Sequence, residues 1–349
     1  MKYLYVLLLF IPVTIIGKIM GLSDTVLFVT SALAIIPLAG LMGKSTDVIS
    51  CYAGQRIGGL LNATFGNATE LIIAFIAMKE GLFEVVKASL AGSVIGNILL
   101  VLGMSMLLGG IHHKTQRFNK NSINITASML LFAVLGLAIP AIFTYTLPES
   151  SLTGRLEGLN IIVAILMLLI YIMQFVFTFG THRALYEDVN SDEDEEHPAM
   201  SLPLAVGMLV GATVFIAVIS EIFVGTVEPM AENAGLSTTF VGIILVPIIG
   251  NAAEHSTAII MAMKDKMNAA VEIALGSSLQ IILFVIPVLI LLSLLFEPMS
   301  IIFSPFEIVS VAASVLIANR VASDGESNWL EGLQLVSVYV IIGAAFFFV

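Results

Sequence analysis

The chain alternates between long apolar runs and short polar turns from one end to the other. A membrane-spanning helix needs about 20 consecutive apolar residues, and a longer run fits when the helix tilts. On this rule the pattern predicts an all-α polytopic membrane protein with about eleven transmembrane helices. The predicted spans are approximately 2–19, 24–53, 55–79, 85–109, 122–146, 156–181, 203–233, 237–263, 268–295, 300–320 and 328–348.

Composition agrees with this interpretation, since 58% of the 349 residues are hydrophobic and only 11% are charged. Soluble domains carry roughly 25% charged residues, so this chain lacks the polar groups to cover a globule in water. Its single cysteine, Cys51, excludes an internal disulfide and a cysteine metal cluster. The sequence shows no haem or nucleotide fingerprint, and we expect no cofactor.

The net charge of −11 argues against a nucleic-acid partner, and much of it is local. The acidic stretch consists of Glu187, Asp188, Asp192, Glu193, Asp194, Glu195 and Glu196. It lacks the central glycine of an EF-hand loop. Such a block is commonly a solvated linker. Because we place it on the cytoplasmic side, from which a cation would enter the site described below, we favour a regulatory, cation-responsive segment.

Lysine and arginine positions predict the orientation in the cell membrane. With the N-terminus in the cytoplasm, ten of these residues face inward and four face outward. The acidic stretch is then cytoplasmic and the C-terminus external. Residues 112–120, HHKTQRFNK, are expected to form an ordinary cytoplasmic loop.

One polar motif occurs twice inside apolar spans. GNATELIIAF at 66–75 returns as GNAAEHSTAI at 250–259, and the alignment continues without gaps into the next helix of each copy. The matched pairs include Gly66 with Gly250, Asn67 with Asn251, Glu70 with Glu254, and Ser93 with Ser277. Five predicted helices separate the copies, so they must cross the bilayer in opposite senses, as in many secondary transporters.

This symmetry predicts the domain organisation. Two inverted five-helix repeats are expected at 21–182 and 201–349, joined by an acidic cytoplasmic linker at 183–200. Residues 1–20 form an extra N-terminal transmembrane helix outside the symmetry.

The duplicated carboxylates, Glu70 and Glu254, lie near the middle of their spans, where a charge costs several kcal/mol unless it is paired, protonated or solvated. Each shares a helix face with the asparagine three residues earlier. Oxygen ligands of this kind suit a hard cation such as Ca²⁺. Gly66, Gly250 and Pro247 would loosen the helices and free backbone carbonyls as further ligands. Alternatively, both acids are structural and satisfied by neighbouring amides or hydroxyls.

A second constellation joins AGSVIGN at 91–97 to LGSSLQI at 275–281. Ser93 and Ser277 either contribute oxygen atoms to the site or serve close helix packing. Asn97 and Gln280 add amides. The symmetry fails here, because Asn97 aligns with Ile281.

Three further residues are candidates for modulating roles. His255 follows Glu254 but points about 100° away around the helix, so we favour hydrogen bonding over direct ligation. Asp47 and Glu228 could attract cations at opposite ends of the path, or pair with polar groups at helix ends.

The paired motifs resemble those of the calcium/cation antiporter superfamily, and the resemblance runs from PLAGLMG at residue 37 to the C-terminus. The histidine after the second acid, GSSLQI and DGESNWLEG from Asp324 are similar to its cation/proton exchanger branch. The sodium-coupled branch is less similar, since it has no evident counterpart to His255 and SSLQ.

The resemblance implies Ca²⁺/H⁺ antiport by alternating access, with no enzymatic activity. It implies that Glu70 and Glu254 bind the metal or protons in competition. The surrounding shell would be Asn67, Asn251, Ser93, Ser277 and Gln280, with carbonyls near Gly66 and Gly250. The partners are Ca²⁺, H⁺ and the bilayer, and a homo-oligomer is left open. A Na⁺-coupled exchanger, a cation channel and an intramembrane hydrolase remain as rivals.

Overall fold

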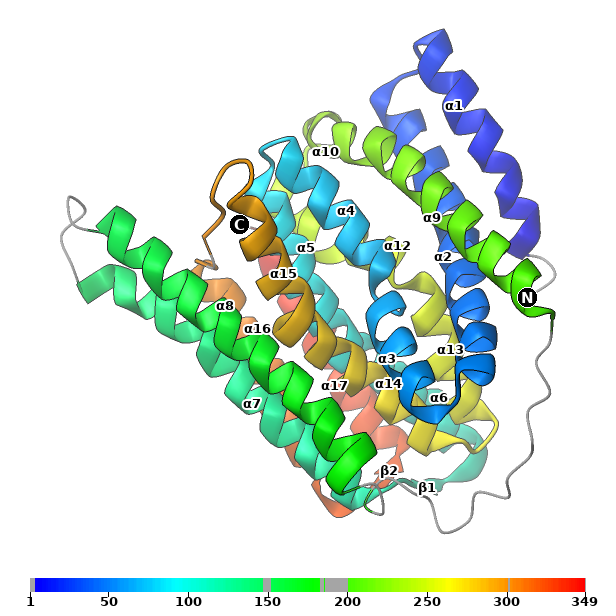
Figure 1. Cartoon of the computed structure of the whole chain (residues 1–349), viewed down its shortest axis with the longest axis vertical. Helices are drawn as coiled ribbons and strands as arrows, with labels where there is room; N and C mark the ends of the chain where they lie inside the picture. Colours follow the sequence, from blue (N-terminus) through cyan, green and yellow to red (C-terminus); the bar gives the residue numbers. More distant parts are fainter. Residues whose placement is uncertain (1–3, 147–151, 183–184, 186–199, 301, 349) are drawn as a thin grey trace. The chain divides into compact units, whose positions relative to one another are not determined.

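The computed structural model describes residues 4–146, 152–182, 185, 200–300 and 302–348. Helices joined by short turns make up nearly all of this part (Figure 1). Among the described residues, eight helices are long and apolar enough to cross a membrane, or nine if the bent pair Val227–Ala234 and Thr238–Gly250 is one span. The prediction of an all-helical membrane protein is confirmed, whereas the count of eleven is not.

The helices pack into two compact units, which are described separately. Unit 1 holds Met1–Ser89, Ser191–Glu254 and Val349, and unit 2 holds Leu90–Asn190 and His255–Phe348. The division falls inside α5 (Phe83–Ile95) and α13 (Ala252–Met263). The expected repeats at 21–182 and 201–349 concern symmetry rather than packing, and they stay a prediction.

Unit 1 is built around two long helices, α2 and α9, which pack along each other with α1 beside both (Figure 1). The rings of Phe28 and Phe223 stack between α2 and α9 with centroids 4.9 Å apart. The elements that lie wholly in this unit are η1 (Leu4–Leu9), α1 (Phe10–Met20), α2 (Asp24–Ala53), α3 (Gln55–Phe65), α4 (Ala68–Lys79), α9 (Leu202–Gly225), α10 (Val227–Ala234), α11 (Thr238–Phe240), η7 (Val241–Leu245) and α12 (Val246–Gly250).

Two predicted spans are broken where the repeated motif begins. The span expected at 55–79 is divided into α3 and α4, and the one expected at 237–263 is divided between α12 and α13. Asn67 (φ −98°, ψ 20°) and Asn251 (φ −94°, ψ 6°) leave the helical conformation, whereas Gly66 keeps it. Each asparagine therefore makes the break, and the carboxylate three residues later lies in the first turn of a new helix.

Except for α5 and α13, which are divided between the units, unit 2 holds the remaining helices. They are η2 (Gly96–Val101), α6 (Leu102–His113), α7 (Lys120–Phe143), η3 (Thr144–Thr146), α8 (Leu152–Val176), η5 (Phe177–Thr181), α14 (Met267–Gln280), η8 (Ile281–Val285), α15 (Ile286–Ser293), α16 (Pro305–Val321), η9 (Ala322–Asp324) and α17 (Trp329–Phe347). Glycines let α6 and α17 approach closely: a Cβ on Gly332 would lie 2.6 Å from the carbonyl oxygen of Gly103. Small residues commonly permit such contacts between membrane helices.

Two π-helical turns of unit 2 keep the register of the sequence repeat. The amide of Leu102 donates to the carbonyl of Asn97, and the amide of Ile286 donates to that of Ile281. The gapless alignment that matches Glu70 with Glu254 also matches the two donors with each other and the two acceptors with each other. The correspondence between the two copies thus extends to an irregular backbone turn.

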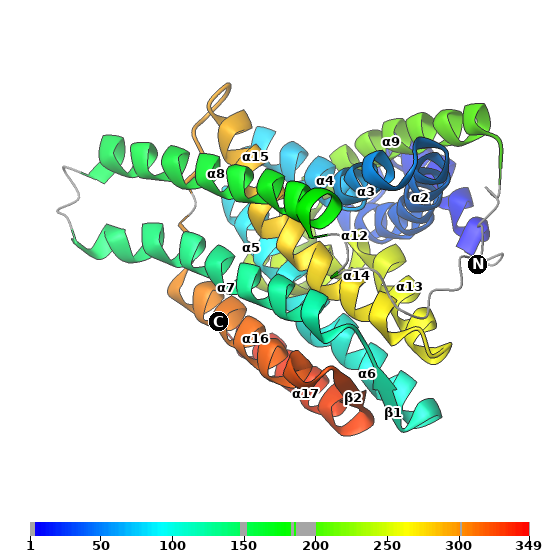
Figure 2. The ribbon, with the colours of Figure 1, turned by 60° about the horizontal axis from the view of Figure 1, so that its bottom comes forward.

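Residues 112–120 do not form the ordinary loop that the sequence suggested. β1 (Thr115–Arg117) pairs antiparallel with β2 (Glu326–Asn328), in register Gln116 to Ser327. Figure 2 shows this ribbon beside the ends of α6 and α17. Gln116 and Ser327 are buried. The ribbon is a local departure from an otherwise helical unit.

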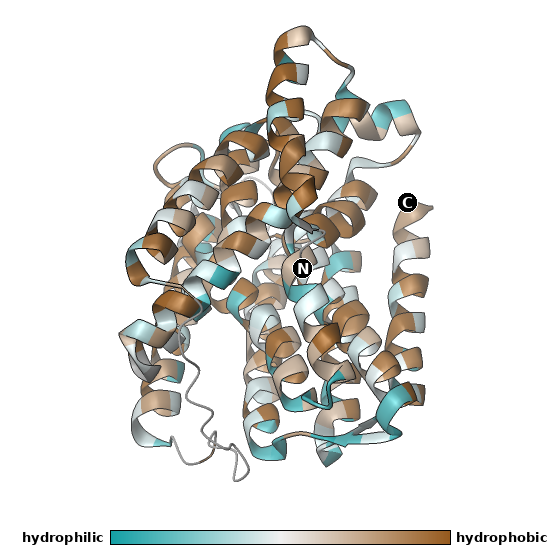
Figure 3. Cartoon of the chain, turned by 90° about the vertical axis from the view of Figure 1, so that its right-hand side faces the viewer, coloured by the Kyte–Doolittle hydropathy of each residue, from teal (hydrophilic) through white to brown (hydrophobic). Residues whose placement is uncertain are grey.

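Large apolar side chains remain exposed along the outer helices. On α9 they include Val206, Val210 and Val214, and on α8 they include Ile162 and Ile165. Figure 3 shows hydrophobic residues along most of the length of the helices. Because these helices carry little charge, their exposed faces suit the hydrocarbon interior of a bilayer.

Candidate cation site

Glu70 is a charged residue buried inside unit 1. It lies in the first turn of α4 and is only 7% exposed. Neither of its carboxylate oxygens accepts a hydrogen bond from another described residue, and neither is accessible to solvent. A buried carboxylate without donors is strongly disfavoured unless a proton or a cation neutralises it.

Glu254 lies close enough to Glu70 for the two carboxylates to repel each other electrostatically. It occupies the first turn of α13 and is half-buried. The approach follows from packing, because α12 contacts α4 and leads directly into α13. Together the two carboxylates carry the charge that balances one divalent cation, or they can hold protons in its place.

Gly250 borders the acid pair. A Cβ built on it would lie 3.7 Å from Glu70 Oε1 and 3.8 Å from Glu70 Cγ. The glycine therefore leaves open space against the carboxylate where any other residue would place a side chain.

The two asparagines of the motif are buried, each 1% exposed. Asn251 Nδ2 donates to the carbonyl of Pro247 at 3.0 Å, and the backbone amide of Asn251 donates to the same oxygen at 2.9 Å. The carbonyl of Asn67 accepts from the amide of Leu71 at 3.0 Å. Some of the backbone carbonyls that the sequence predicted to be free at the breaks therefore accept hydrogen bonds within the protein.

Unit 2 gathers a second polar group from the predicted residues. Asn97 Nδ2 donates to Ser277 Oγ at 3.0 Å, and His255 Nε2 lies 3.2 Å from Asn97 Oδ1. Since Asn97 uses its amide NH₂ toward Ser277, its oxygen is the acceptor and His255 Nε2 carries the proton. Asn97, Ser277 and Ser93 are buried. His255 therefore has a hydrogen-bond partner in unit 2, and its modulating role stays a prediction.

The remaining candidates are placed as follows. Gln280 ends α14 and is half-buried. Asp47 on α2 and Glu228 in the first turn of α10 are exposed, unlike the buried acid pair. The acidic stretch at 187–196 lies outside the described residues. Among the described residues, no three His, Cys, Asp or Glu side chains form a metal-binding group, so amide, carbonyl or water oxygens would have to complete a shell.

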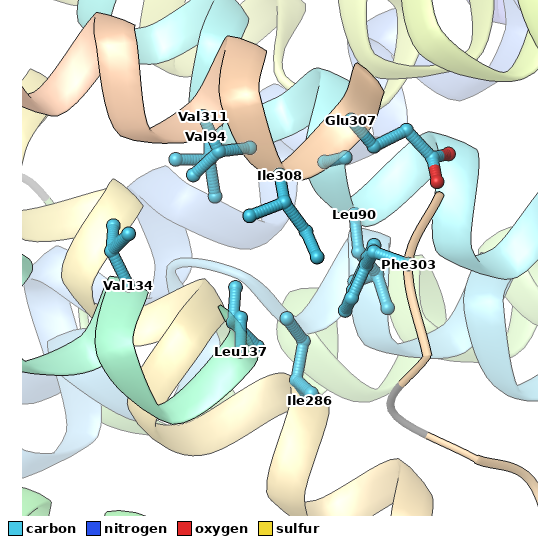
Figure 4. A pocket seen from close by; sticks show the side chains of 10 residues that line it. Leu90, Val94, Val134, Leu137, Ile286, Phe303, Glu307, Ile308 and Val311 are labelled. Atoms are coloured by element: carbon cyan, nitrogen blue, oxygen red, sulfur yellow. The ribbon is translucent and has the colours of Figure 1, made fainter. Parts of the chain in front are cut away.

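One buried acid, Glu307, is not among the residues predicted from the sequence. It is 3% exposed and accepts a hydrogen bond from the amide of Ser304 at 2.7 Å, while Ser304 Oγ accepts from the amide of Glu307 at 3.2 Å. This capping box begins α16 and gives the carboxylate a structural role. Figure 4 shows Glu307 at the edge of a cavity otherwise lined by apolar side chains such as Leu137 and Ile286. The Ser-x-x-Glu pattern was the available signal.

Comparison with known proteins agrees with the motif resemblance. A Synechocystis protein named Ca(2+)/H(+) antiporter is 45% identical over 365 residues, covering 99% of this chain and 97% of the relative. The Bacillus subtilis protein named Ca(2+)/H(+) antiporter ChaA is 45% identical over 341 residues, covering 97% and 96%. A solved structure of native YfkE has a TM-score of 0.86 and 40% identity, covering 99% of this chain and 100% of that one.

The family described as "Sodium/calcium exchanger protein" matches residues 23–180 and 204–348. These two ranges include both copies of the repeated motif and leave the acidic stretch between them. The resemblance to the cation/proton exchanger branch is confirmed, and the chain belongs to the sodium/calcium exchanger protein family.

Proposed function

We propose that this chain is a secondary antiporter that exchanges cytoplasmic Ca²⁺ for external H⁺ across the cell membrane. Two relatives that match nearly the whole chain at 45% identity are named Ca(2+)/H(+) antiporters. The observation that carries the proposal is Glu70, a buried carboxylate that accepts no hydrogen bond from another described residue and faces the charge of Glu254.

The exchange follows from the charge balance of this pair. Ca²⁺ binding requires both carboxylates to be ionised, and the ion's two positive charges neutralise them. When the ion leaves, two desolvated negative charges repel each other, so the pair takes up protons. An empty, doubly charged site would be costly to carry through an occluded state, and this penalty suppresses unloaded return.

The proposal assigns the buried amides and hydroxyls to supporting roles. Asn67 and Asn251 set the breaks that place the acids in first turns, where the positive end of a helix dipole favours negative charge. Ser93, Ser277, Asn97 and Gln280 belong to the proposed polar shell. Asp47, Glu228 and the acidic stretch would act on cation entry or regulation.

Alternating access would come from two inverted five-helix repeats. The gapless alignment of the two copies pairs the helix start Ala68 with Ala252 and the helix start Phe83 with Met267, which supports a duplication. Adding two broken spans and the N-terminal helix to the eight long apolar helices gives the eleven predicted crossings. We infer a cytoplasmic N-terminus and acidic linker, and an external C-terminus.

The direct test is ⁴⁵Ca²⁺ uptake into proteoliposomes driven by a pH gradient. Glu70→Gln and Glu254→Gln keep the side-chain size and remove one charge each, so both should abolish uptake. Glu80→Gln is the matched control, because Glu80 is an exposed glutamate at the end of the same helix as Glu70. Normal uptake by either acid-pair variant would refute the assigned roles.

Varying Na⁺ at clamped pH separates the proposal from a Na⁺-coupled exchanger, which the family description also covers. Uptake that needs a Na⁺ gradient and ignores the pH gradient would replace H⁺ by Na⁺ as the coupling ion. Unitary currents in a planar bilayer would indicate a channel instead.

A further inference from the structure

The helix that carries Glu254 ends in an unusual way. Lys266 N donates to Met261 O at 2.9 Å and Asp265 N donates to Ala262 O at 3.1 Å, which is the Schellman pattern of helix termination. Asp265 occupies the left-handed position of this turn, with φ of 61°. Glycine normally fills that position, because a Cβ is unfavourable there.

The first copy of the repeat shows what the ordinary solution is. At the end of α4, Leu82 N donates to Ala77 O at 2.9 Å and Gly81 N donates to Met78 O at 3.1 Å. Gly81, with φ of 77°, is the counterpart of Asp265 in the gapless alignment of the two copies. The second copy thus has a strained aspartate where the first has a glycine, and retained strain of this kind points to a role for the side chain.

The aspartate side chain is held by Gln116 of β1. Gln116 Nε2 donates to Asp265 Oδ1 at 2.8 Å and to the carbonyl of Ala262 at 2.8 Å, and Gln116 is 2% exposed. One amide group therefore joins the turn residue and a terminal carbonyl of α13. His113, at the end of α6, adds a contact of 3.0 Å between its Nε2 and the carbonyl of Met263.

The backbone of α6 is shaped to admit this arrangement. A Cβ on Gly109 would collide with Gln116 Oε1 and would lie 3.1 Å from the carbonyl of Ala262. The two described non-glycine residues with positive φ are Lys114, between α6 and β1, and Asp265, which accepts a hydrogen bond from Gln116 of β1. Strain and close packing are concentrated where α6, β1 and the end of α13 meet.

We propose that Gln116 and Asp265 are positioning residues for Glu254. They fasten the C-terminal end of α13 to α6 and β1, and so fix the axial position and rotation of the helix that presents the carboxylate. Glu254 lies eight residues before Ala262, about 12 Å along a stiff helix. The turn after α4 has Gly81 at the corresponding position, with no side chain to hold, so the two acids are supported differently. This inference rests on the proposed function, in which Glu254 binds Ca²⁺.

The test uses the full-length chain and compares KM for Ca²⁺ with the maximal rate of uptake. Asp265→Gly restores the residue type of the first copy, which suits the turn, and removes only the acceptor. Gln116→Met keeps a similar size and removes the donors. Both should raise KM about tenfold, the lower end of the range for residues that support metal ligands, while the maximal rate stays near wild type.

Two further variants separate positioning from general stability. Asp265→Asn tolerates the left-handed conformation and keeps an oxygen that accepts from Gln116, so it should restore the wild-type KM. Arg117→Gln breaks the exposed ion pair with Glu326 at 3.0 Å in the same ribbon and should leave KM unchanged. A wild-type KM in Asp265→Gly, with or without a lowered melting temperature, would overturn the proposal.

Amide hydrogen exchange of the purified protein gives a readout that does not depend on transport. Residues 256–260, whose amides donate to carbonyls in the first turns of α13, should exchange faster in Asp265→Gly and Gln116→Met than in wild type or Arg117→Gln. If wild type shows no Ca²⁺/H⁺ exchange, the proposed function fails and this measurement alone decides the positioning role. Unchanged protection of residues 256–260 in both variants would refute it.

Discussion

The space beside Glu70 gives a sharp test of where the cation binds, through Gly250→Ala. The added Cβ would lie 3.7 Å from Glu70 Oε1, an ordinary contact distance, so the chain should accept it without a clash. Ca²⁺ binds carboxylate oxygens at about 2.4 Å. An ion on the Gly250 side of Oε1 would then lie only about 1.3 Å from the methyl carbon if the three atoms were collinear. The methyl and the ion therefore exclude each other.

We expect this variant to separate stability from transport. The alanine should stabilise the end of α12 by about 0.5 kcal/mol, because glycine is a poor helix former. It should raise KM for Ca²⁺ about tenfold, about 1.4 kcal/mol of binding free energy, because one direction of approach to Glu70 is lost. Thermal unfolding in detergent measures the change in stability, and proton-driven ⁴⁵Ca²⁺ uptake over a range of Ca²⁺ concentrations measures KM.

Gly211→Ala is the matched control. Gly211 lies inside α9, and no heavy atom comes within 4 Å of a Cβ built there. It should gain about 1 kcal/mol of stability from helix propensity and leave KM unchanged. If Gly250→Ala has the KM of wild type, the ion does not occupy the space between Gly250 and Glu70, and the position inferred for it is wrong.

Two other outcomes are expected. Gly332→Ala should lower the free energy of unfolding by about 2–3 kcal/mol, because overpacking is destabilising and the new methyl would meet backbone atoms of Gly103 and Leu107. Melting curves in detergent measure this change, and a melting temperature equal to wild type would contradict the prediction. KM for Ca²⁺ should rise as the pH falls on the loading side, by roughly tenfold per pH unit for each competing proton; a KM independent of pH would show that protons do not compete at this site.

The sequence located the acid pair because a carboxylate inside an apolar span is conspicuous and this one is duplicated. Glu70 and Glu254 do lie together in unit 1, and Asn97, Ser277 and His255 do form one hydrogen-bonded group in unit 2. That these two groups make a single site stays a prediction.

Other features could not be read from local patterns. Gln116 lies in a basic, polar segment that resembles an ordinary cytoplasmic loop, and its hydrogen bonds go to Ala262 and Asp265, which are remote from it in the chain. The count of eleven spans stays a prediction, because asparagines divide two of the apolar runs into helices of 13 residues or fewer, each too short to cross a membrane alone. Glu307, by contrast, follows a Ser-x-x-Glu pattern, which is the local sequence signature of a capping box.

The paired π turns at Asn97–Leu102 and Ile281–Ile286 fix the rotation, about its own axis, of the helix that follows each turn. A π turn holds one more residue than an α turn, and each residue of a helix corresponds to about 100° of rotation. Removing a single residue from either turn would restore regular α geometry and swing the downstream helix by that angle, so that part of its buried side would face lipid. The two segments should accept changes of side chain far more readily than any change of length. Because both turns have the same length, corresponding residues of the two copies remain aligned beyond them.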